Sequence, residues 1–415
     1  MFVLRKYFLL LAIFWMIVSS CSNYMLDQGG FFSKFQRKQF KEAADLIKEK
    51  SEKENKDQIL FLLDRGTALF EAGDYKSAIE VLTKAERLTE MNDYTSISEE
   101  LVSVVTTDQY KKFYPLDYEL IMINVYLGLS YYMEGKYDDA AVECRRINNL
   151  IYKLKNKGMK SFEESPFAWY LSAAIYDIQK KYSDARIDYK KVMDLVPNFK
   201  QAVYDVYRTS RQSNNLDQAR ELEQKYPNLD LRRYYNGLCK KCGDLIVIFS
   251  EGEIPIKIQN PHNSMLPEFR TRTYSVGNLV VFNAQGEELG ASSEITNLEL
   301  IARKNLEERV GKIVSKRLLG IGTQVAVGYG VAKATKSESL GILTGLLLHA
   351  AATQADTRSW STLPKSFQVV RLRLPAGKSL LSFKNTIDTG IRSTIAEQEI
   401  DIISGTTKML LIRSF

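Results

Sequence analysis

The sequence repeats one short pattern, Phe40-Lys-Glu-Ala43, Tyr75-Lys-Ser-Ala78, Tyr137-Asp-Asp-Ala140, Tyr182-Ser-Asp-Ala185 and Leu216-Asp-Gln-Ala219. The alanines that end these stretches are 35, 62, 45 and 34 residues apart. Two of the intervals match the length of a helix-turn-helix repeat, and the other two match the same unit with insertions. The pattern therefore predicts a stack of antiparallel helix pairs.

The residues around these stretches resemble the tetratricopeptide repeat. In that pattern, small residues let two antiparallel helices approach, and aromatic residues fill the space to the next pair. The positions that carry the resemblance are Gly66, Tyr75, Ala78, Gly128, Tyr137, Ala140, Trp169, Tyr182 and Ala185. We expect these to be packing residues of a repeat domain at 35–230. The resemblance implies that a peptide or a partner protein binds the concave groove of this domain.

The longest interval between repeats carries an insertion near Asn92 to Lys112. Its segment from Ser96 is predicted to form an extra helix that caps or plugs the groove. Cys144 occupies a position where the second helix of a pair packs, so we expect a buried, inert thiol.

The composition excludes several classes of protein. The chain has 415 residues, with 57 Lys and Arg against 50 Asp and Glu, two histidines and four cysteines. No basic tail or acidic block indicates a nucleic-acid partner. Two histidines are too few for a multi-histidine metal centre. We therefore expect neither a nucleic acid, nor a bound metal, nor a cofactor.

The N-terminus has the features of an export signal. Arg5 and Lys6 precede an apolar run from Phe8 to Val18, and Ser19 and Ser20 follow it. The 11 apolar residues span about 16 Å as a helix, which is about half of a bilayer's hydrocarbon core. Such a run is too short for a permanent membrane span.

The residues Val18-Ser19-Ser20-Cys21 resemble the lipobox of bacterial lipoproteins. The resemblance implies that segment 1–20 is removed, that Cys21 carries the lipid, and that residues 21–34 form a tether. Ser22 stands where inner-membrane retention usually shows Asp, which implies an outer-membrane protein that faces the periplasm. The alternatives are an ordinary export signal with a chance cysteine, or an anchor helix.

The helical pattern ends near Tyr226-Pro227, and we expect a linker at 231–244 followed by a β-rich domain at 245–415. The expected strands are Leu245 to Phe249, Ile254 to Ile258, Asn278 to Phe282, Phe367 to Leu374, Ser379 to Phe383, Ile395 to Ile403 and Lys408 to Ile412. Short β-branched segments separated by Gly-containing turns favour a sandwich or an open barrel. The predicted fold class is α+β, an N-terminal tetratricopeptide-like α-solenoid followed by a β-sandwich-like domain.

A helical hairpin at 297–353 is predicted to interrupt the β-domain. Its first arm is amphipathic, and the rest is rich in Gly and Ala, including Gly341-x-x-x-Gly345, a spacing used for close contact of membrane helices. Neither arm reaches the roughly 20 apolar residues that span a bilayer. Two interpretations stay open: a tight hairpin packed on the β-domain, or an insertion into a membrane or an oligomeric contact.

The remaining reactive side chains indicate no catalytic site. Cys239-Lys-Lys-Cys242 can form a local disulfide, half of a metal site or a redox pair, and an oxidising envelope favours the disulfide. His262 follows a turn-forming proline, and His349 lies in an apolar stretch. No nucleophile elbow or phosphate-binding loop is present in the sequence. We therefore expect a non-enzymatic protein.

The densest polar cluster is Asp356-Thr-Arg358-Ser-Trp360, which precedes a strand ending in Pro375-Ala-Gly377. This element resembles a family of bacterial envelope lipoproteins that combine tetratricopeptide-like helices with a C-terminal β-domain. The resemblance implies a fold and a location but no activity. We expect Asp356 and Arg358 to form a buried pair at the exit of the hairpin, with Trp360 in the sandwich core; a ligand site is the alternative.

Together these patterns predict a lipid-anchored adaptor or regulator of an envelope assembly, for instance in cell-wall synthesis or surface-structure biogenesis. Its partners would be envelope proteins or peptides in the groove, and the membrane through the lipid on Cys21. The alternative function is that of a membrane-active or oligomerising protein that inserts its Gly/Ala-rich hairpin.

Overall fold

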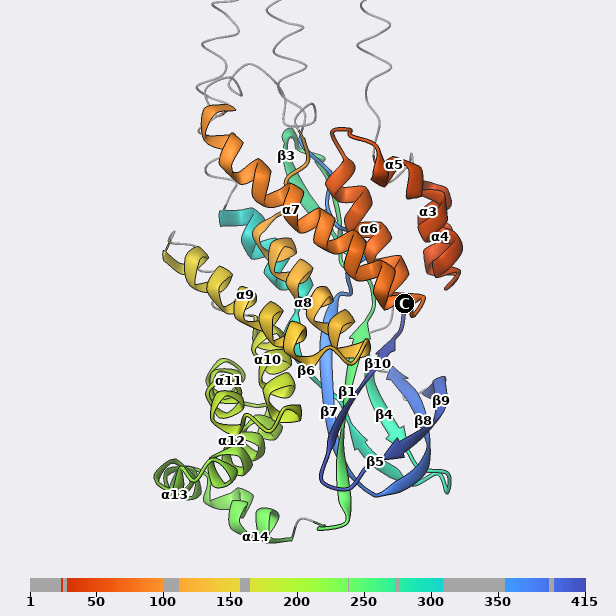
Figure 1. The fold of residues 1–415 in the computed structure, drawn as a ribbon. Helices are drawn as coiled ribbons and strands as arrows, with labels where there is room; N and C mark the ends of the chain where they lie inside the picture. The colour runs from red at the N-terminus through yellow and green to blue at the C-terminus, as the bar shows by residue number, and fades with distance from the viewer. Residues whose placement is uncertain are drawn as a thin grey trace, which may run out of the picture.

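The computed structural model describes residues 24, 28–99, 112–156, 165–237, 239–272, 277–308, 355–387 and 392–415. Helices form the N-terminal half of this part of the chain and strands form most of the C-terminal half (Figure 1). The predictions for the signal segment, for Cys21 and for residues 320–353 with His349 lie outside the described residues.

The helical half is a series of consecutive helix pairs. The pairs are α6 (Gln58–Glu71) with α7 (Tyr75–Glu99), α8 (Asp117–Met133) with α9 (Tyr137–Asn156), α10 (Pro166–Ile178) with α11 (Tyr182–Leu195), and α12 (Lys200–Gln212) with α13 (Leu216–Lys225). The predicted extra helix near Ser96 is in part a continuation of α7 as far as Glu99. The rest of that insertion lies outside the described residues.

One backbone feature recurs at the turn of every unit. The residue two positions before each repeated stretch has a positive φ: Lys38 (61°), Gly73 (78°), Gly135 (71°), Lys180 (59°) and Asn214 (58°). Glycine adopts this left-handed conformation at little cost, and asparagine tolerates it better than most residues. The shared turn shows that the stretch beginning at Phe40 belongs to the same series as the other four.

The first unit replaces much of the predicted tether. α3 (Gly29–Gln36) pairs with α4 (Phe40–Leu46), and α5 (Lys48–Glu52) leads to α6. The tether prediction for 21–34 is therefore wrong from residue 29 onward. The reason is apolar burial, because Phe31, Phe32 and Phe35 are each at most 7% exposed and a tether in water would leave them solvated.

The predicted linker at 231–244 is also wrong over most of its length. η3 (Pro227–Leu229) leads into α14 (Leu231–Asn236), and the first strand begins at Cys242. The Asp230 carboxylate caps α14 by accepting a hydrogen bond from the Arg233 N–H, which satisfies a free donor at the helix start. The ring of Tyr234 packs on Tyr204 with centroids 4.4 Å apart, so α14 closes the end of the helical stack.

The C-terminal half contains ten strands among the described residues. They are β1 (Cys242–Glu251), β2 (Ile256–Asn260), β3 (Asn263–Arg270), β4 (Gly277–Phe282), β5 (Glu288–Ala291), β6 (Ser293–Asn297), β7 (Ser366–Pro375), β8 (Gly377–Ile387), β9 (Arg392–Ile402) and β10 (Thr407–Arg413). Each of the seven expected segments overlaps one of them. β3, β5 and β6 were not predicted, because they carry little apolar alternation.

Two four-stranded sheets and a hairpin are built from these strands. The sheet orders are β10-β1-β7-β6 and β5-β4-β8-β9, and β2 pairs with β3. β1 and β10 run parallel, whereas the other pairs are antiparallel. Between β6 and the insertion, residues 298–308 are helical, as expected for the start of its first arm.

The sheet that contains β1 is covered on both faces. Leu245 and Val247 point into a core shared with Val281 and Phe383 of the second sheet. Ile246 and the alternate residues of β7 and β10 belong instead to the core of the helical half. Because successive side chains of a strand alternate between faces, the apolar run of β1 joins three layers: helices, sheet and sheet.

Within the described part of the chain, no helix combines sufficient length with sufficient apolarity to span a membrane.

Candidate functional site

The inner face of the helical stack, formed by α6, α8, α10 and α12, is covered by the C-terminal half of the same chain. Residues 355–363, here called the strap, run along α6 and α8. The Trp360 backbone N–H donates to a Glu119 oxygen over 2.7 Å, and the Thr362 hydroxyl donates to Asp64 over 2.8 Å. β7 and β10 continue along α10 and α8. The predicted binding groove is therefore filled by the chain itself, and the expectation of a partner in this groove is wrong for the described state.

The strap begins with a buried cluster of ions. Arg358 is 7% exposed; its Nε lies 2.9 Å and its Nη2 2.7 Å from the carboxylate oxygens of Asp356. Its Nη1 lies 2.6 Å from Asp57, the residue before α6. Burial alone would raise the pKa of Asp356, but the hydrogen bonds and charge of Arg358 hold it below its usual value. The pair fixes the exit of the insertion onto the helical half.

Trp360 lies at the centre of the strap and is 0% exposed. Its indole N–H is 3.0 Å from the hydroxyl oxygens of both Thr67 and Thr362, and its ring packs 5.6 Å from that of Tyr126. The prediction that Trp360 fills the sandwich core is therefore wrong. A buried indole needs an acceptor, which Thr67 of α6 supplies, whereas the core between the sheets is lined by apolar side chains.

Asp64 connects the strap to the N-terminal segment. Its carboxylate accepts hydrogen bonds from the hydroxyls of Thr362 and, over 2.9 Å, of Tyr24. Burial raises the pKa of Asp64 to about 7, and the two hydroxyl donors oppose part of that effect. Asp64 therefore changes its charge more readily near neutral pH than an exposed aspartate does. Because Thr362 of the strap donates to this carboxylate, the change alters the strength of that hydrogen bond.

Glu119 performs two tasks in the same region. It accepts a 2.6 Å hydrogen bond from the Leu116 N–H and so caps α8, and it also accepts the Trp360 N–H. Burial raises the pKa of the Glu119 carboxyl, and these donors oppose the shift. Loss of this side chain would leave both backbone donors without their partner.

A second ionic cluster joins β7 to α10 and α12. Arg371 Nη1 lies 2.9 Å from Asp177 of α10 and 3.0 Å from Asp205 of α12, and its Nη2 lies 2.7 Å from Asp244 of β1. Arg208 also donates to Asp177 over 3.0 Å. Burial would raise the pKa of Asp177, but the two guanidiniums lower it to about 2. This carboxylate is therefore ionised throughout the physiological pH range.

Apolar and terminal contacts complete the interface. The rings of Phe167 in α10 and Phe367 in β7 stack with centroids 3.9 Å apart. The Met409 N–H of β10 donates to the Tyr132 hydroxyl over 2.7 Å. The ring of Phe415, the last residue, packs 5.4 Å from that of Phe35 in α3. The first and last elements of the described chain are thus in contact.

Six of the nine repeat residues predicted from the sequence lie in helix–helix contacts, whereas Tyr137 is 43% exposed and does not fill the core. Ala78, Ala140 and Ala185 are 0% exposed, and Trp169 is 7% exposed. Gly66 faces Leu82, and Gly128 faces Glu143 of the paired helix. The three tyrosines, Tyr75, Tyr137 and Tyr182, lie nearer the surface.

The cysteines and histidines are placed as follows. Cys239 and Cys242 form a disulfide with Cα atoms 5.3 Å apart, and Cys144 is a buried free thiol whose pKa is raised by burial. His262 lies in the exposed turn between β2 and β3. Among the residues that the structure describes, no group of three or more His, Cys, Asp or Glu side chains could hold a metal ion.

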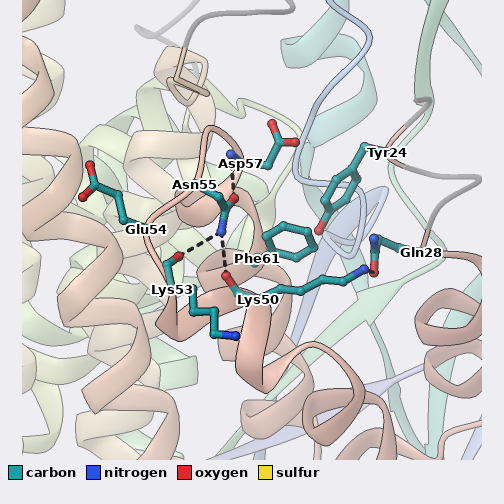
Figure 2. Close-up of a pocket in the computed structure, with 8 residues that line it drawn as sticks. All are labelled: Tyr24, Gln28, Lys50, Lys53, Glu54, Asn55, Asp57 and Phe61. Atoms are coloured by element: carbon teal, nitrogen blue, oxygen red, sulfur yellow. Dashed lines mark hydrogen bonds between the residues drawn. The ribbon is translucent and has the colours of Figure 1, made fainter. Parts of the chain in front are cut away.

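An open hollow of about 500 Å³ lies where the N-terminal segment meets α6. Figure 2 shows the rings of Tyr24 and Phe61 beside one another, with Lys50 below them. The centroids of the two rings are 5.2 Å apart. The Lys50 ammonium donates to Gln28 over 3.2 Å. The lining residues also include Lys53, Glu54, Asn55 and Asp57. Two lysines and two carboxylates line the hollow, so its formal charges balance and favour neither anions nor cations.

The sequence pointed to Asp356, Arg358 and Trp360, but it did not reveal their partners on the helices, nor the cluster around Arg371, because these groups lie far apart along the chain. One signal was nonetheless present. Asp64 interrupts the apolar stretch Ile59-Leu-Phe-Leu-Leu63, and Glu119 precedes Leu120-Ile-Met-Ile123. A carboxylate within an apolar helix rarely becomes buried unless it has a partner. Such positions could have been proposed as sites of long-range hydrogen bonding.

No protein-family model matches the chain, and no curated protein matches it. Solved structures similar to its helical half include MamA from Desulfovibrio magneticus RS-1, 18% identical over 50% of this chain and 94% of that one, with a TM-score of 0.33. A putative kinesin light chain of Podosopora anserina with tetratricopeptide-like repeats is 13% identical over 51% and 96%, with a TM-score of 0.35. BtubC from P. vanneervenii is 13% identical over 50% and 78%, with a TM-score of 0.34. Similarity at this level does not identify what this chain binds.

Proposed function

We propose that this protein is a lipid-anchored, non-enzymatic lipoprotein of the bacterial outer membrane. It faces the periplasm and acts as a protein-binding adaptor or regulator of an envelope assembly. The lipobox-like residues that end at Cys21 support the anchor. The Asp356 to Trp360 element supports membership in the envelope lipoprotein family that the sequence resembles. The two sheets that enclose an apolar core support a β-sandwich-like domain following a tetratricopeptide-like solenoid.

One observation supports an outer-face binding surface for the proposed adaptor. The inner face of the helical stack already holds the strap, β7 and β10 through buried hydrogen bonds and ion pairs. A partner therefore binds the outer face, the solvent-exposed side of α7, α9, α11 and α13. Exposed apolar side chains on this face include Met91 (64%), Tyr152 (67%) and Ile187 (48%), and such residues surrounded by charges are typical of protein interfaces.

Crosslinking in cells tests the location of the partner. A photoreactive amino acid replaces Ile187 on the outer face in one strain and Lys378 in a second, because Lys378 is 72% exposed on β8 of the other half. We expect an envelope protein to be captured from position 187 and not from position 378. Capture only from position 378 would refute the outer-face assignment. Tyr152 provides a third position, on the outer face. Failure to capture an envelope protein from all three positions would refute the adaptor proposal.

The anchor is tested separately. In cells that express Cys21→Ala, we expect loss of metabolically incorporated palmitate and release of the protein from the outer-membrane fraction. Retention of both lipid and membrane association by the variant would refute the assignment of Cys21. The Cys144→Ala variant is the matched control, since that thiol is buried and should not affect fractionation.

A further inference from the structure

We infer that one end of the folded body lies against the bilayer that carries the anchor, and that a lipid surface is the partner of this end. The proximal end, as we call it, consists of α5, the starts of α6 and α8, the last residues of helix 298–308 and the beginning of the strap. The inference rests on the proposed lipid at Cys21, and it specifies the orientation of the protein on the membrane.

The N-terminal segment is fixed to the body at Tyr24. This side chain is 6% exposed; its hydroxyl donates to Asp64 over 2.9 Å, and its ring packs against Phe61 and Phe32 at 5.2 and 6.3 Å. Tyr24 therefore cannot move away from α6 without losing its hydrogen bond to Asp64 and its contact with Phe61.

The length of chain before Tyr24 limits the distance to the membrane. Only three peptide steps separate Cys21 from Tyr24, and a fully extended chain spans at most about 3.6 Å per residue. The Cα atom of Tyr24 therefore lies within about 11 Å of the acylated residue. Because the acyl chains hold Cys21 at the bilayer surface, the part of the body next to Tyr24 must face the lipid.

Contacts between distant segments define the same end. Arg358 at the start of the strap bonds Asp57 at the start of α6 over 2.6 Å. The Phe113 N–H, just before α8, donates to the Lys56 carbonyl over 2.7 Å. The Asn305 amide in helix 298–308 donates to Asp117 at the start of α8 over 3.3 Å. The two points at which insertion 309–354 joins the body therefore lie together at the proximal end.

The described residues on either side of segment 309–354 lie at this same end. They are the last residues of helix 298–308 and the first residues of the strap, and both belong to the end that the short anchor holds against the bilayer. In the opposite direction, α13 and α14 lie at the far end of the molecule (Figure 1), which is turned away from the membrane.

Fluorescence quenching on vesicles tests the orientation. The mature chain, residues 21–415, is coupled through Cys21 to a maleimide phospholipid, since Cys144 is buried and Cys239 is disulfide-bonded to Cys242. Tryptophan replaces either Lys53 at the proximal end or Arg220 on α13, whose side chains are equally exposed at 72% and 71%. The vesicles contain phosphatidylcholine with a nitroxide on its headgroup.

We expect the added fluorescence of Lys53→Trp to fall at least twofold on these vesicles and that of Arg220→Trp to stay unchanged. A Gly/Ser insertion of about 20 residues after Ser22 should abolish the difference, since the short tether causes it. Equal quenching at both positions, or quenching of Arg220→Trp alone, would overturn the inference. In this experiment Cys21 is coupled to lipid chemically, so the result does not depend on whether cells lipidate Cys21. An error in the Cys21 assignment would appear only in the fractionation experiment with Cys21→Ala.

Discussion

Arg371 of β7 and Asp177 of α10 form a buried ion pair with an Nη1–Oδ2 distance of 2.9 Å, although 194 residues separate them in the sequence. Their side chains are 4% and 1% exposed. An ion pair removed from water is stable only when further hydrogen bonds satisfy its remaining atoms. Arg208, Asp205 and Asp244 supply those partners. The helical half and the β-rich half are thus held in one arrangement by charges that neither half could bury alone.

Replacing Arg371 by Met should destabilise the protein strongly. The variant would leave the carboxylates of Asp177, Asp205 and Asp244 with less positive charge in a buried site. Breaking a buried pair from one side costs about 3–5 kcal/mol, so we expect a loss of that size in the free energy of urea unfolding. Lys378→Met is the control, because the exposed Lys378–Glu399 pair should contribute less than about 1 kcal/mol. Equal effects of the two substitutions would contradict the assigned role of the cluster.

The two helix glycines of the repeat should respond to alanine in opposite ways. A Cβ atom at Gly66 would lie 2.4 Å from Leu82 Cδ2 and 2.6 Å from its Cγ, whereas a Cβ at Gly128 meets nothing nearer than 3.6 Å. Overpacking a core costs about 1–3 kcal/mol, so Gly66→Ala should lower the free energy of unfolding. Gly128→Ala should raise it by up to about 1 kcal/mol, because alanine is the better helix former.

Thermal unfolding of both variants measures this difference. A second substitution, Leu82→Ala, removes the atoms that obstruct the new methyl group at position 66. In that background, Gly66→Ala should no longer destabilise the protein. If it still did, backbone strain rather than contact with Leu82 would be responsible.

The repeat architecture could be predicted from the sequence because its determinants are local. The stretch at Tyr75 and the one at Tyr182 share a spacing and a turn, even though the turn residue is Gly73 in one unit and Lys180 in the other. Each helix pair is specified by contacts within about 35 residues, and a periodic pattern records such contacts directly.

The strap and the filled groove could not be predicted because their determinants are distant in sequence. Trp360 meets Thr67 across 293 residues, and neither residue carries a mark of the other. Composition showed Trp360 to be a core residue but could not distinguish between two available cores. The burial of Phe35 in α3 was missed for the same reason, since its ring packs against that of the C-terminal Phe415.

Stability should depend on the titration of Asp64. Its pKa of about 7 in the folded protein lies above the value of about 3.9 expected in an unfolded chain. A raised pKa means that the folded state holds the proton more tightly, so this contribution is complete below about pH 4 and is lost as the pH rises through 7. Between pH 7.5 and 5, wild type should gain about 2–3 kcal/mol relative to Asp64→Asn.

Urea unfolding of both proteins across this pH range provides the measurement. Tyr24, Glu119 and Arg272 also act on Asp64, and both proteins contain these groups. Tyr24→Phe removes one donor to the carboxylate and should raise the pKa of Asp64 further. A stability difference that did not vary with pH would show that Asp64 is ionised in the folded protein well below pH 7.

Arg358→Ala distinguishes a structural from a ligand-binding role of the Asp356 to Trp360 element. The guanidinium bonds both Asp356 oxygens and Asp57, so its removal leaves two carboxylates beside the start of α6 without their cation. We expect a loss of about 3–5 kcal/mol and a lower Tm. Arg358→Lys should recover part of the loss, because lysine keeps the charge but cannot bond both oxygens of Asp356 and Asp57 in one plane.

An unchanged Tm together with lost capture of a partner from position 187 would instead assign the element to binding. The structural role predicts that partner capture by the two variants follows their stability.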